Sequence, residues 1–329
     1  MKKYFSVKLS NGNTFDVEEG QSILDGAIQN GFQLPYSCKT GRCSTCKSKI
    51  TGRSKALLDE LGISKEDISN GAGLVCVRTP ETDLELDISD LGDLNLPKPQ
   101  TIPVKVSSKV KISENVMILK LRLPPNKVFQ FIAGQYVNLI GPNNIRRSYS
   151  LANTVVESEL ELQISRVQNG LMSDFIFNHV KKGDLLRVNG PHGTFVLRDL
   201  SNKHLVFLAT GTGIAPVQSM LGSLPKIDQA SLPSSTTIYW GARIFEDLYV
   251  DIKTHDFLQY YPVLSRAGQK WSGRRGYVHQ NMLDDFDNLS DVIVYACGSN
   301  KMISDAKNRL IANGHPSNQF FSDAFVASS

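Results

Sequence analysis

The chain has 329 residues, of which 41% are hydrophobic and 21% are charged, and its formal net charge is +4. This composition is ordinary for a folded protein of two or three domains, and it excludes a disordered tail, a collagen and a membrane bundle. The charge is too small and too mixed to favour nucleic-acid binding, and no apolar run approaches the roughly 20 residues that cross a bilayer.

The beginning of the chain is typical of a small α+β domain. Residues 3–9 and 14–17 alternate as strands around the Asn11-Gly12 turn, which is a strong hairpin signal. Ser22 is a plausible N-cap for a helix that Gly31 would end. Because this segment offers no apolar core for a signal peptide, we expect a cytoplasmic protein without a membrane partner.

Four of the five cysteines lie close to this helix. Cys38, Cys43 and Cys46 have the spacing C-x4-C-x2-C, and Cys76 follows after 29 intervening residues. This is the ligand spacing of a plant-type [2Fe-2S] cluster, and Gly41 permits the backbone to curl around it. Zinc is the main rival for four thiols, but zinc sites usually show two short C-x2-C pairs. Four reduced structural cysteines are the remaining alternative.

The cysteine-rich segment is also basic. No acid occurs between Tyr36 and Leu58, and the cations there are Lys39, Arg42, Lys47, Lys49, Arg53 and Lys55. Such a run is most often only a solvated face. The alternative hypothesis is that an acidic redox partner docks on it, in which case added salt would slow electron transfer steeply.

A proline-rich stretch separates this domain from the rest. Residues 94–103 contain three prolines and predict an extended linker after a first domain of residues 1–93. That domain has 11 Lys and Arg against 14 Asp and Glu, a net charge of −3, so the remaining residues carry +7.

The middle of the chain predicts an antiparallel β-barrel over residues 104–200, with one helix at 173–180. Its expected strands are residues 104–110, 116–123, 136–140, 160–167 and 185–189. Within it, Arg147, Tyr149 and Ser150 offer a guanidinium for a diphosphate, a ring to lie against another ring, and a hydroxyl donor. Gly170 and Ser173 stand at the start of the helix, where free N–H groups favour phosphate, although Ser173 could simply be an N-cap.

Residues 201–329 alternate strands with helices, which predicts a parallel sheet with its ligand site at the carboxyl ends of the strands. The strands are expected at 204–209, 236–240, 262–265 and 291–296, and the helices at 217–221 and 302–311. Gly211-Thr212-Gly213 and Pro216 follow the first strand directly and form a credible pyrophosphate loop, with a tight turn as the alternative. Cys297-Gly298 follows the last expected strand. Because buried free cysteines are common, this thiol by itself would be interpreted as a core residue.

These motifs, in this order and over essentially the whole chain, resemble the ferredoxin-NAD(P) reductase superfamily with a ferredoxin domain fused at the front. The resemblance implies a β-grasp [2Fe-2S] domain, a FAD-binding barrel and a NAD-binding α/β domain. It implies that Cys38, Cys43, Cys46 and Cys76 bind the cluster. The residues it assigns to FAD are Arg147 and Tyr149, Ser150 near the flavin N5, and Gly170 and Ser173 at the diphosphate.

For the nicotinamide dinucleotide the resemblance implies binding by Gly211, Thr212, Gly213, Pro216 and Gly298. Cys297 would lie near the hydride-donating carbon as a catalytic residue together with Ser150. Phe325, with Asp323 close by, is the candidate to close the other face of the flavin. The segment 241–249 resembles NADH-using members, and no Lys or Arg pair for a 2′-phosphate stands out beside it, so NADH is favoured over NADPH.

The implied reaction is electron transfer from NADH through FAD and the cluster to an external acceptor. In overall sequence the chain most resembles the CDP-6-deoxy-Δ3,4-glucoseen reductase family, whose partner is a pyridoxamine-phosphate (PMP)-dependent dehydrase of a CDP-sugar in 3,6-dideoxyhexose and lipopolysaccharide biosynthesis. The alternatives are the reductase component of an aromatic-ring or methane oxygenase and, in another class, a non-enzymatic iron-sulfur carrier or sensor. No motif in the sequence recognises a sugar.

Overall fold

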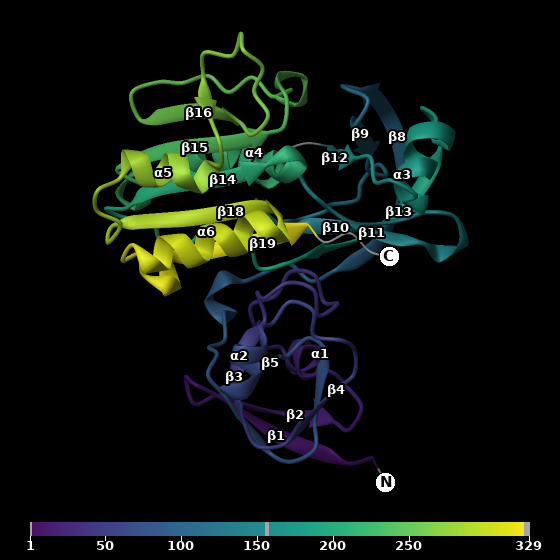
Figure 1. The fold of residues 1–329 in the computed structure, drawn as a ribbon. Coiled ribbons are helices and arrows are strands. Elements are labelled where there is room, and N and C mark those ends of the chain that lie inside the picture. The colour runs from purple at the N-terminus through teal and green to yellow at the C-terminus, as the bar shows by residue number, and fades with distance from the viewer. Residues whose placement is uncertain (1, 155–157, 326–329) are drawn as a thin grey trace. The chain divides into compact units, whose positions relative to one another are not determined.

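The structure is a computed structural model that describes residues 2–154 and 158–325 (Figure 1). The chain divides into two compact units, Met1–Leu96 and Pro97–Ser329. None of the helices in the described ranges combines the length and the hydrophobicity needed to span a bilayer.

The first unit is built on a five-stranded sheet in the order β2-β1-β7-β3-β5. Strand β1 pairs antiparallel with β2 and parallel with β7, which is the strand arrangement of a β-grasp fold and confirms that expectation. Its strands are β1 Tyr4–Leu9, β2 Thr14–Glu18, β3 Lys47–Thr51, β5 Ala72–Leu74 and β7 Leu84–Leu86, beside a separate pair, β4 Ser54–Ala56 and β6 Arg78–Pro80. Its helices are α1 Ile23–Gln29 and α2 Lys65–Ser69.

Helix α1 begins and ends at the residues that the sequence predicts. The Ser22 hydroxyl accepts a hydrogen bond from the Asp25 N–H at 3.1 Å, and Gly31 adopts a φ of +86° just after the helix. Gly26 lies against β2 so closely that a Cβ there would come within 2.7 Å of the Val17 side chain. The helix therefore packs directly on the sheet, with Ile23, Leu24 and Ala27 buried.

The second unit begins with a six-stranded antiparallel sheet in the order β11-β10-β13-β8-β9-β12. A bridge between Leu151, just after the edge strand β11, and Leu162, in the middle of the other edge strand β12, closes the sheet into a barrel around a core of aliphatic and aromatic side chains. The strands are β8 Gln100–Lys111, β9 Val116–Arg122, β10 Tyr136–Ile140, β11 Arg146–Ser150, β12 Glu159–Ser165 and β13 Leu185–His192. The antiparallel barrel is thus confirmed.

Two local expectations for this barrel differ from the structure. Residues 100–103, expected in the linker, are part of β8 and pair with β13. Pro103 is tolerated because β9 pairs with β8 only from Lys105 onward, so no ladder hydrogen bond is lost on that side. The helix expected at 173–180 begins earlier, as α3 Leu171–Asp174, and continues as a π-helical turn over Phe175–His179.

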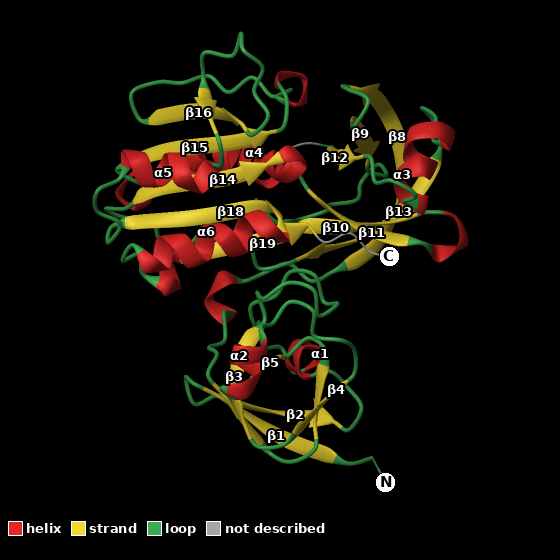
Figure 2. Cartoon of the chain, in the orientation of Figure 1, coloured by secondary structure: helices red, strands yellow, loops and turns green. Residues whose placement is uncertain are grey.

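The second unit continues with an all-parallel six-stranded sheet in the order β17-β16-β15-β14-β18-β19, as expected for an α/β domain. The helices run along this sheet in Figure 2. The strands are β14 His204–Thr210, β15 Ser235–Ala242, β16 Leu258–Leu264, β17 Arg274–Arg275, β18 Val292–Ser299 and β19 Phe320–Phe325, and the helices are α4 Ile214–Ser223, α5 Val278–Asp285 and α6 Asn300–Ala312. Single 3-10 turns lie at Gly92–Leu94, Pro142–Asn144, Gly211–Gly213, Leu224–Lys226, Gln229–Ser231, Phe245–Asp247 and Ser317–Gln319.

Candidate functional site

The four cysteines of the first unit come together as two pairs of sulfurs. The Cys38 thiol is hydrogen-bonded to that of Cys43, and the Cys46 thiol to that of Cys76. Among residues 2–154 and 158–325, no three His, Cys, Asp or Glu side chains surround a point in the way a single metal ion requires. Two thiol pairs are compatible with a centre of two irons, each bound by two sulfurs.

The backbone around these sulfurs is shaped by glycines. Gly41 has a φ of +70°, and a Cβ there would lie 2.4 Å from the Asp59 carbonyl oxygen. The Gly62 N–H donates to the Gly41 carbonyl at 2.8 Å, and a Cβ at Gly62 would lie 2.3 Å from the Cys43 carbonyl oxygen. The segment 59–62 is therefore packed directly on the cysteine loop, and larger residues at either glycine would push the loop apart.

Backbone donors surround the first thiol of the loop. The N–H groups of Thr40 and Cys43 both point at the Cys38 Sγ at 3.4 Å. Together with the Cys43 thiol they lower the pKa of Cys38, while the same pairing and burial raise the pKa of Cys43. Such donors stabilise sulfur as a thiolate, the form that binds metal.

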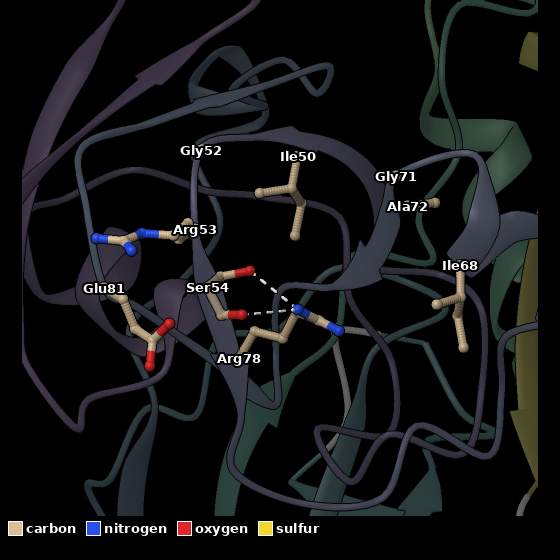
Figure 3. Close-up of a pocket in the computed structure, with 9 residues that line it drawn as sticks. All are labelled: Ile50, Gly52, Arg53, Ser54, Ile68, Gly71, Ala72, Arg78 and Glu81. Atoms are coloured by element: carbon tan, nitrogen blue, oxygen red, sulfur yellow. Dashed lines mark hydrogen bonds between the residues drawn. The ribbon is translucent and has the colours of Figure 1, made fainter.

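A buried ion pair between Arg78 and Glu60 holds the segment 59–62 against the cysteine loop. The Arg78 guanidinium donates to both carboxylate oxygens of Glu60, at 2.8 Å from Nη2 and 2.9 Å from Nε. Its Nη1 binds the carbonyl and hydroxyl oxygens of Ser54, as Figure 3 shows beside a cavity of about 280 Å³. Glu60 also accepts from the Leu74 N–H at 2.7 Å. Only 7% of the Glu60 side chain is exposed, so it ties the segment to the strands that flank Cys76.

In the second unit, β11 carries the three residues expected at the flavin. Tyr149 packs on the barrel core, and burial raises the pKa of its hydroxyl. The Arg147 Nη1 donates to the Arg146 carbonyl at 2.7 Å. The buried Ser150 hydroxyl donates to the Asp323 Oδ2 at 3.3 Å, which joins the barrel to β19 of the parallel sheet.

Gly170 and Ser173 occupy one tight turn. Gly170 is the N-cap of α3, so the reading of Ser173 as the N-cap is wrong. The Ser173 hydroxyl instead donates to the Gly170 carbonyl at 2.9 Å and accepts from the Val167 N–H at 3.1 Å. It closes the turn that places the first N–H groups of α3 at the edge of the barrel.

The glycine loop after β14 is held from several sides. Trp240 donates from its indole Nε1 to the Gly211 carbonyl at 2.9 Å, and the hydroxyls of Thr212 and Ser165 lie 3.0 Å apart. A Cβ at Gly213 would lie 2.3 Å from the Cys297 carbonyl oxygen. Pro216 is buried in the first turn of α4. The loop after β14 and the end of β18 are thus in direct contact, as the sequence pattern predicts for neighbouring parallel strands.

Cys297 lies at this junction, between the glycine loop and β19. It is fully buried and pairs across the ladder with Asp323, and burial followed by the charge of Asp323 raises its pKa, so the thiol is neutral at pH 7. The next two pairs of the ladder are Gly298 with Ala324 and Ser299 with Phe325. The Phe325 side chain packs against the core of the α/β domain. Ser150, Asp323 and Cys297 therefore form one small polar group at the carboxyl ends of the strands.

A pair of arginines, which the sequence did not suggest, lies at the ends of β15 and β16. The Arg266 N–H donates to the Arg243 carbonyl at 3.1 Å, and both side chains are exposed. The two residues are 23 positions apart along the chain and meet because parallel strands end at the same edge of a sheet. The structure thus brings a second arginine next to the segment 241–249, through a contact of the two backbones.

Comparison with known proteins matches three family models to this architecture. They are the 2Fe-2S iron-sulfur cluster binding domain over residues 7–81, the oxidoreductase FAD-binding domain over 103–197 and the oxidoreductase NAD-binding domain over 207–308. A curated protein of Yersinia pestis, CDP-6-deoxy-L-threo-D-glycero-4-hexulose-3-dehydrase reductase, is 41% identical over 98% of this chain and 99% of its own. The chain belongs to the ferredoxin-NAD(P) reductase superfamily, in the branch with a fused [2Fe-2S] domain.

Two further curated relatives and one solved structure are similar to this chain over nearly its whole length. Protein RfbI of Salmonella typhimurium is 39% identical over 95% of this chain and 94% of its own. A reductase component of terephthalate 1,2-dioxygenase from Comamonas is 30% identical over 95% of both. Among solved structures, an Amycolatopsis cytochrome P450 reductase has a TM-score of 0.76 at 26% identity, covering 99% of this chain and 100% of that one.

The three matched domains define the cofactors of this chain and its class of reaction. FAD, NADH and a [2Fe-2S] cluster are the cofactors of this chain, which is an NAD(P)H-dependent oxidoreductase. The flavin and nicotinamide domains argue against a non-enzymatic iron-sulfur carrier. Sequence reasoning missed the Glu60–Arg78 pair and the hydrogen bond from Ser150 to Asp323, because neither residue pair has a local spacing signal.

Proposed function

We propose that this reductase delivers electrons from NADH to a PMP-dependent dehydrase that removes the C3 hydroxyl of a CDP-4-keto-6-deoxyhexose in 3,6-dideoxyhexose biosynthesis. The observation that carries the proposal is the 41% identity to the Yersinia pestis dehydrase reductase over nearly the whole chain. The dioxygenase reductase component, at 30% identity, supports the oxygenase alternative less strongly. Overall, two electrons and two protons would replace the C3–OH bond by a C3–H bond and release water.

The cluster ligands in this proposal are Cys38, Cys43, Cys46 and Cys76, one sulfur pair for each iron. The close fit of Gly41 and Gly62, and the N–H groups aimed at the Cys38 Sγ, support this assignment. None of the five cysteines, all of which lie within the described residues, is joined in a disulfide, which suits a reducing compartment and favours a cytoplasmic location.

The flavin site in this proposal is the edge of the barrel. Arg147 would neutralise the diphosphate, Tyr149 would pack on the ring system, and Ser150 would lie near its reactive nitrogen, while Gly170 and Ser173 would shape the diphosphate turn. FAD, when bound, accepts the two electrons of a hydride together and releases them one at a time.

The nicotinamide site in this proposal is formed by the ends of β14 and β18. Gly211, Thr212 and Gly213 would let the backbone approach the diphosphate, with Gly298 beside them and Pro216 fixing the first turn of α4. Phe325 would cover the exposed side of the flavin.

The buried Cys297 thiol gives a direct test of this nicotinamide site. We expect Cys297→Ala to slow flavin reduction by NADH between about 10- and 100-fold, because the nicotinamide would lose a positioning contact at the reacting carbon. Stopped-flow absorbance of the flavin measures this rate, and Cys297→Ser, which keeps the size of the group, serves as the comparison. Cluster content should not change in either variant. A wild-type rate in Cys297→Ala would reduce the role of this thiol to packing.

Reconstitution tests the proposed acceptor. The purified reductase, NADH, the candidate dehydrase with bound PMP and its CDP-sugar should together give a C3-deoxygenated product, detected by mass spectrometry. Omitting the reductase, or replacing the dehydrase by a terephthalate dioxygenase component, should give none. Product formation with the oxygenase component and none with the dehydrase would favour the oxygenase alternative.

A further inference from the structure

The outer face of barrel strand β12 carries a buried glutamine. Every second residue of this strand points into the barrel core, namely Leu160, Leu162 and Ile164, so the residues between them point outward. An outward amide is ordinarily solvated, yet Gln163 is only 4% exposed. It is buried because helix α4 of the α/β domain lies beside β12 (Figure 1), where the Gln163 amide donates to the Gln218 Oε1.

The same glutamine also binds a tyrosine of the α/β domain. The Tyr249 hydroxyl donates to the Gln163 Oε1 at 2.8 Å. Burial, followed by the charges of Glu161 and Asp247, raises the pKa of Tyr249, so its hydroxyl stays protonated at neutral pH and remains a donor. One side chain of the barrel is thus hydrogen-bonded to two separate elements of the α/β domain, helix α4 and the segment 241–249.

These contacts continue to the glycine loop after β14. The Tyr249 ring lies edge-on to the Trp240 ring, with the centroids 5.3 Å apart and the planes at 85°. The Trp240 indole N–H in turn donates to the Gly211 carbonyl at 2.9 Å. The next outward side chain of β12, Ser165, has its hydroxyl 3.0 Å from that of Thr212. Strand β12 therefore reaches the glycine loop by two routes, one through the aromatic pair and one directly.

The covalent connection between the barrel and the parallel sheet is a single segment, residues 193–203 between β13 and β14. It is anchored on β18, where the Arg198 N–H donates to the Tyr295 hydroxyl at 2.8 Å and the Phe195 ring lies 5.6 Å from the Tyr295 ring. One connection alone would let the barrel and the sheet pivot, whereas a second attachment at β12 fixes the angle between them. Hydrogen bonds are directional, and a pivot would leave the buried Gln163 amide without partners.

We propose that Gln163 is a positioning residue for hydride transfer, which holds the glycine loop at the distance from the barrel edge that the reaction requires. The inference rests on the proposed function in its placement of the flavin and the nicotinamide, but not on the identity of the electron acceptor. The reacting atoms must come within about 3–3.5 Å of each other, and a misplacement of about 1 Å can slow a reaction about 100-fold. Gln163 acts on this distance through Gln218 and Tyr249.

Two variants remove this contact from opposite sides. Gln163→Met keeps an unbranched side chain of similar length without the amide, and Tyr249→Phe removes only the hydroxyl. The matched control is Tyr260→Phe, at a tyrosine of β16 that packs on the core of the same domain. Stopped-flow reduction of the flavin over a range of NADH concentrations gives a limiting rate and an apparent Kd. We expect the limiting rate to fall about tenfold or more in both variants, while the apparent Kd changes less than about twofold and the control changes neither constant.

Two further measurements separate positioning from a general loss of stability. In the double variant, Gln163→Met with Tyr249→Phe, the limiting rate should equal that of Gln163→Met alone, because the hydroxyl has already lost its partner. Effects that multiply would overturn the proposal. Hydrogen exchange of the FAD-loaded Gln163→Met protein should become faster over residues 211–217, while strand β9 keeps its wild-type protection. Wild-type exchange over residues 211–217 together with slow flavin reduction would also overturn the proposal.

Comparison with Cys297→Ala distinguishes this inference from the proposed nicotinamide site. Wild-type limiting rates in Gln163→Met and Tyr249→Phe, with a slow rate in Cys297→Ala, would overturn the inference alone. Wild-type rates in all three variants would contradict the proposed placement of the nicotinamide as well. If Gln163→Met fails to fold, Tyr249→Phe decides the question by the same two constants, because it changes a single oxygen atom.

Discussion

Replacing Cys76 with serine is expected to abolish reduction of the acceptor protein while NADH still reduces ferricyanide at close to the wild-type rate. The reason is that Cys76 supplies one of the four thiols of the proposed cluster site, and its sulfur is already paired with that of Cys46. The barrel and the parallel sheet lie in a separate compact unit with their own cores, so the flavin half of the reaction should persist. We expect acceptor reduction to fall by at least about 100-fold.

Iron and acid-labile sulfide content, visible circular dichroism and the two activities measure the Cys76→Ser outcome. Ser44→Ala is the matched control, because Ser44 lies in the same loop between Cys43 and Cys46 but supplies no thiol. The control should keep its iron and both activities. A Cys76→Ser protein that retained full acceptor reduction would show that the electrons bypass the cysteine loop.

The second large effect is expected at Glu60. In Glu60→Ala the Arg78 guanidinium, whose side chain is only 19% exposed, loses its carboxylate partner. Breaking a buried pair by removing one partner destabilises a protein by about 3–5 kcal/mol, because a buried charge is left uncompensated. Since the same carboxylate holds the segment 59–62 against the cysteine loop, we expect iron to be lost faster to a chelator and at lower urea concentration.

An exposed ion pair in the same unit provides the control. Lys8 and Glu85 lie 3.2 Å apart with their side chains more than half exposed, so Glu85→Ala should cost at most about 1 kcal/mol. Urea titration of the full chain, followed through the cluster absorbance, measures both variants. Removing both partners, Glu60→Ala with Arg78→Ala, should be less destabilising than the sum of the single changes. Equal effects of Glu60→Ala and Glu85→Ala would contradict the anchoring role.

The parts of the fold that could be predicted are those with short-range signals. The Asn11-Gly12 turn, the Ser22 cap and the buried strand β14 are each specified by a few neighbouring residues, and the structure has all three. Strand β11 was missed because four of its five residues are polar or charged, so its sequence shows no alternation of apolar and polar residues. Helix α5 was missed because no side chain caps its N-terminus.

In the candidate site, too, local sequence patterns could be recognised, whereas contacts between residues far apart in the chain could not. The cysteine spacing and the glycine loop are local patterns, and they pointed to the correct families of domain. The hydrogen bond from Ser150 to Asp323 joins residues 173 positions apart, and the Glu60–Arg78 pair joins residues 18 positions apart. Such contacts depend on the packing of complete domains, and no pattern within one element encodes them.

The order of strands in the first unit has a consequence for how the protein matures in the cell. The central strand β7 is the last to be made and pairs with β1 through Leu84 and Val7, so the sheet is complete once residue 86 has been synthesised. All four cysteines and the Glu60–Arg78 pair precede that point. Because N-terminal domains generally fold first during translation, iron and sulfide can be inserted while the ribosome is still producing the barrel.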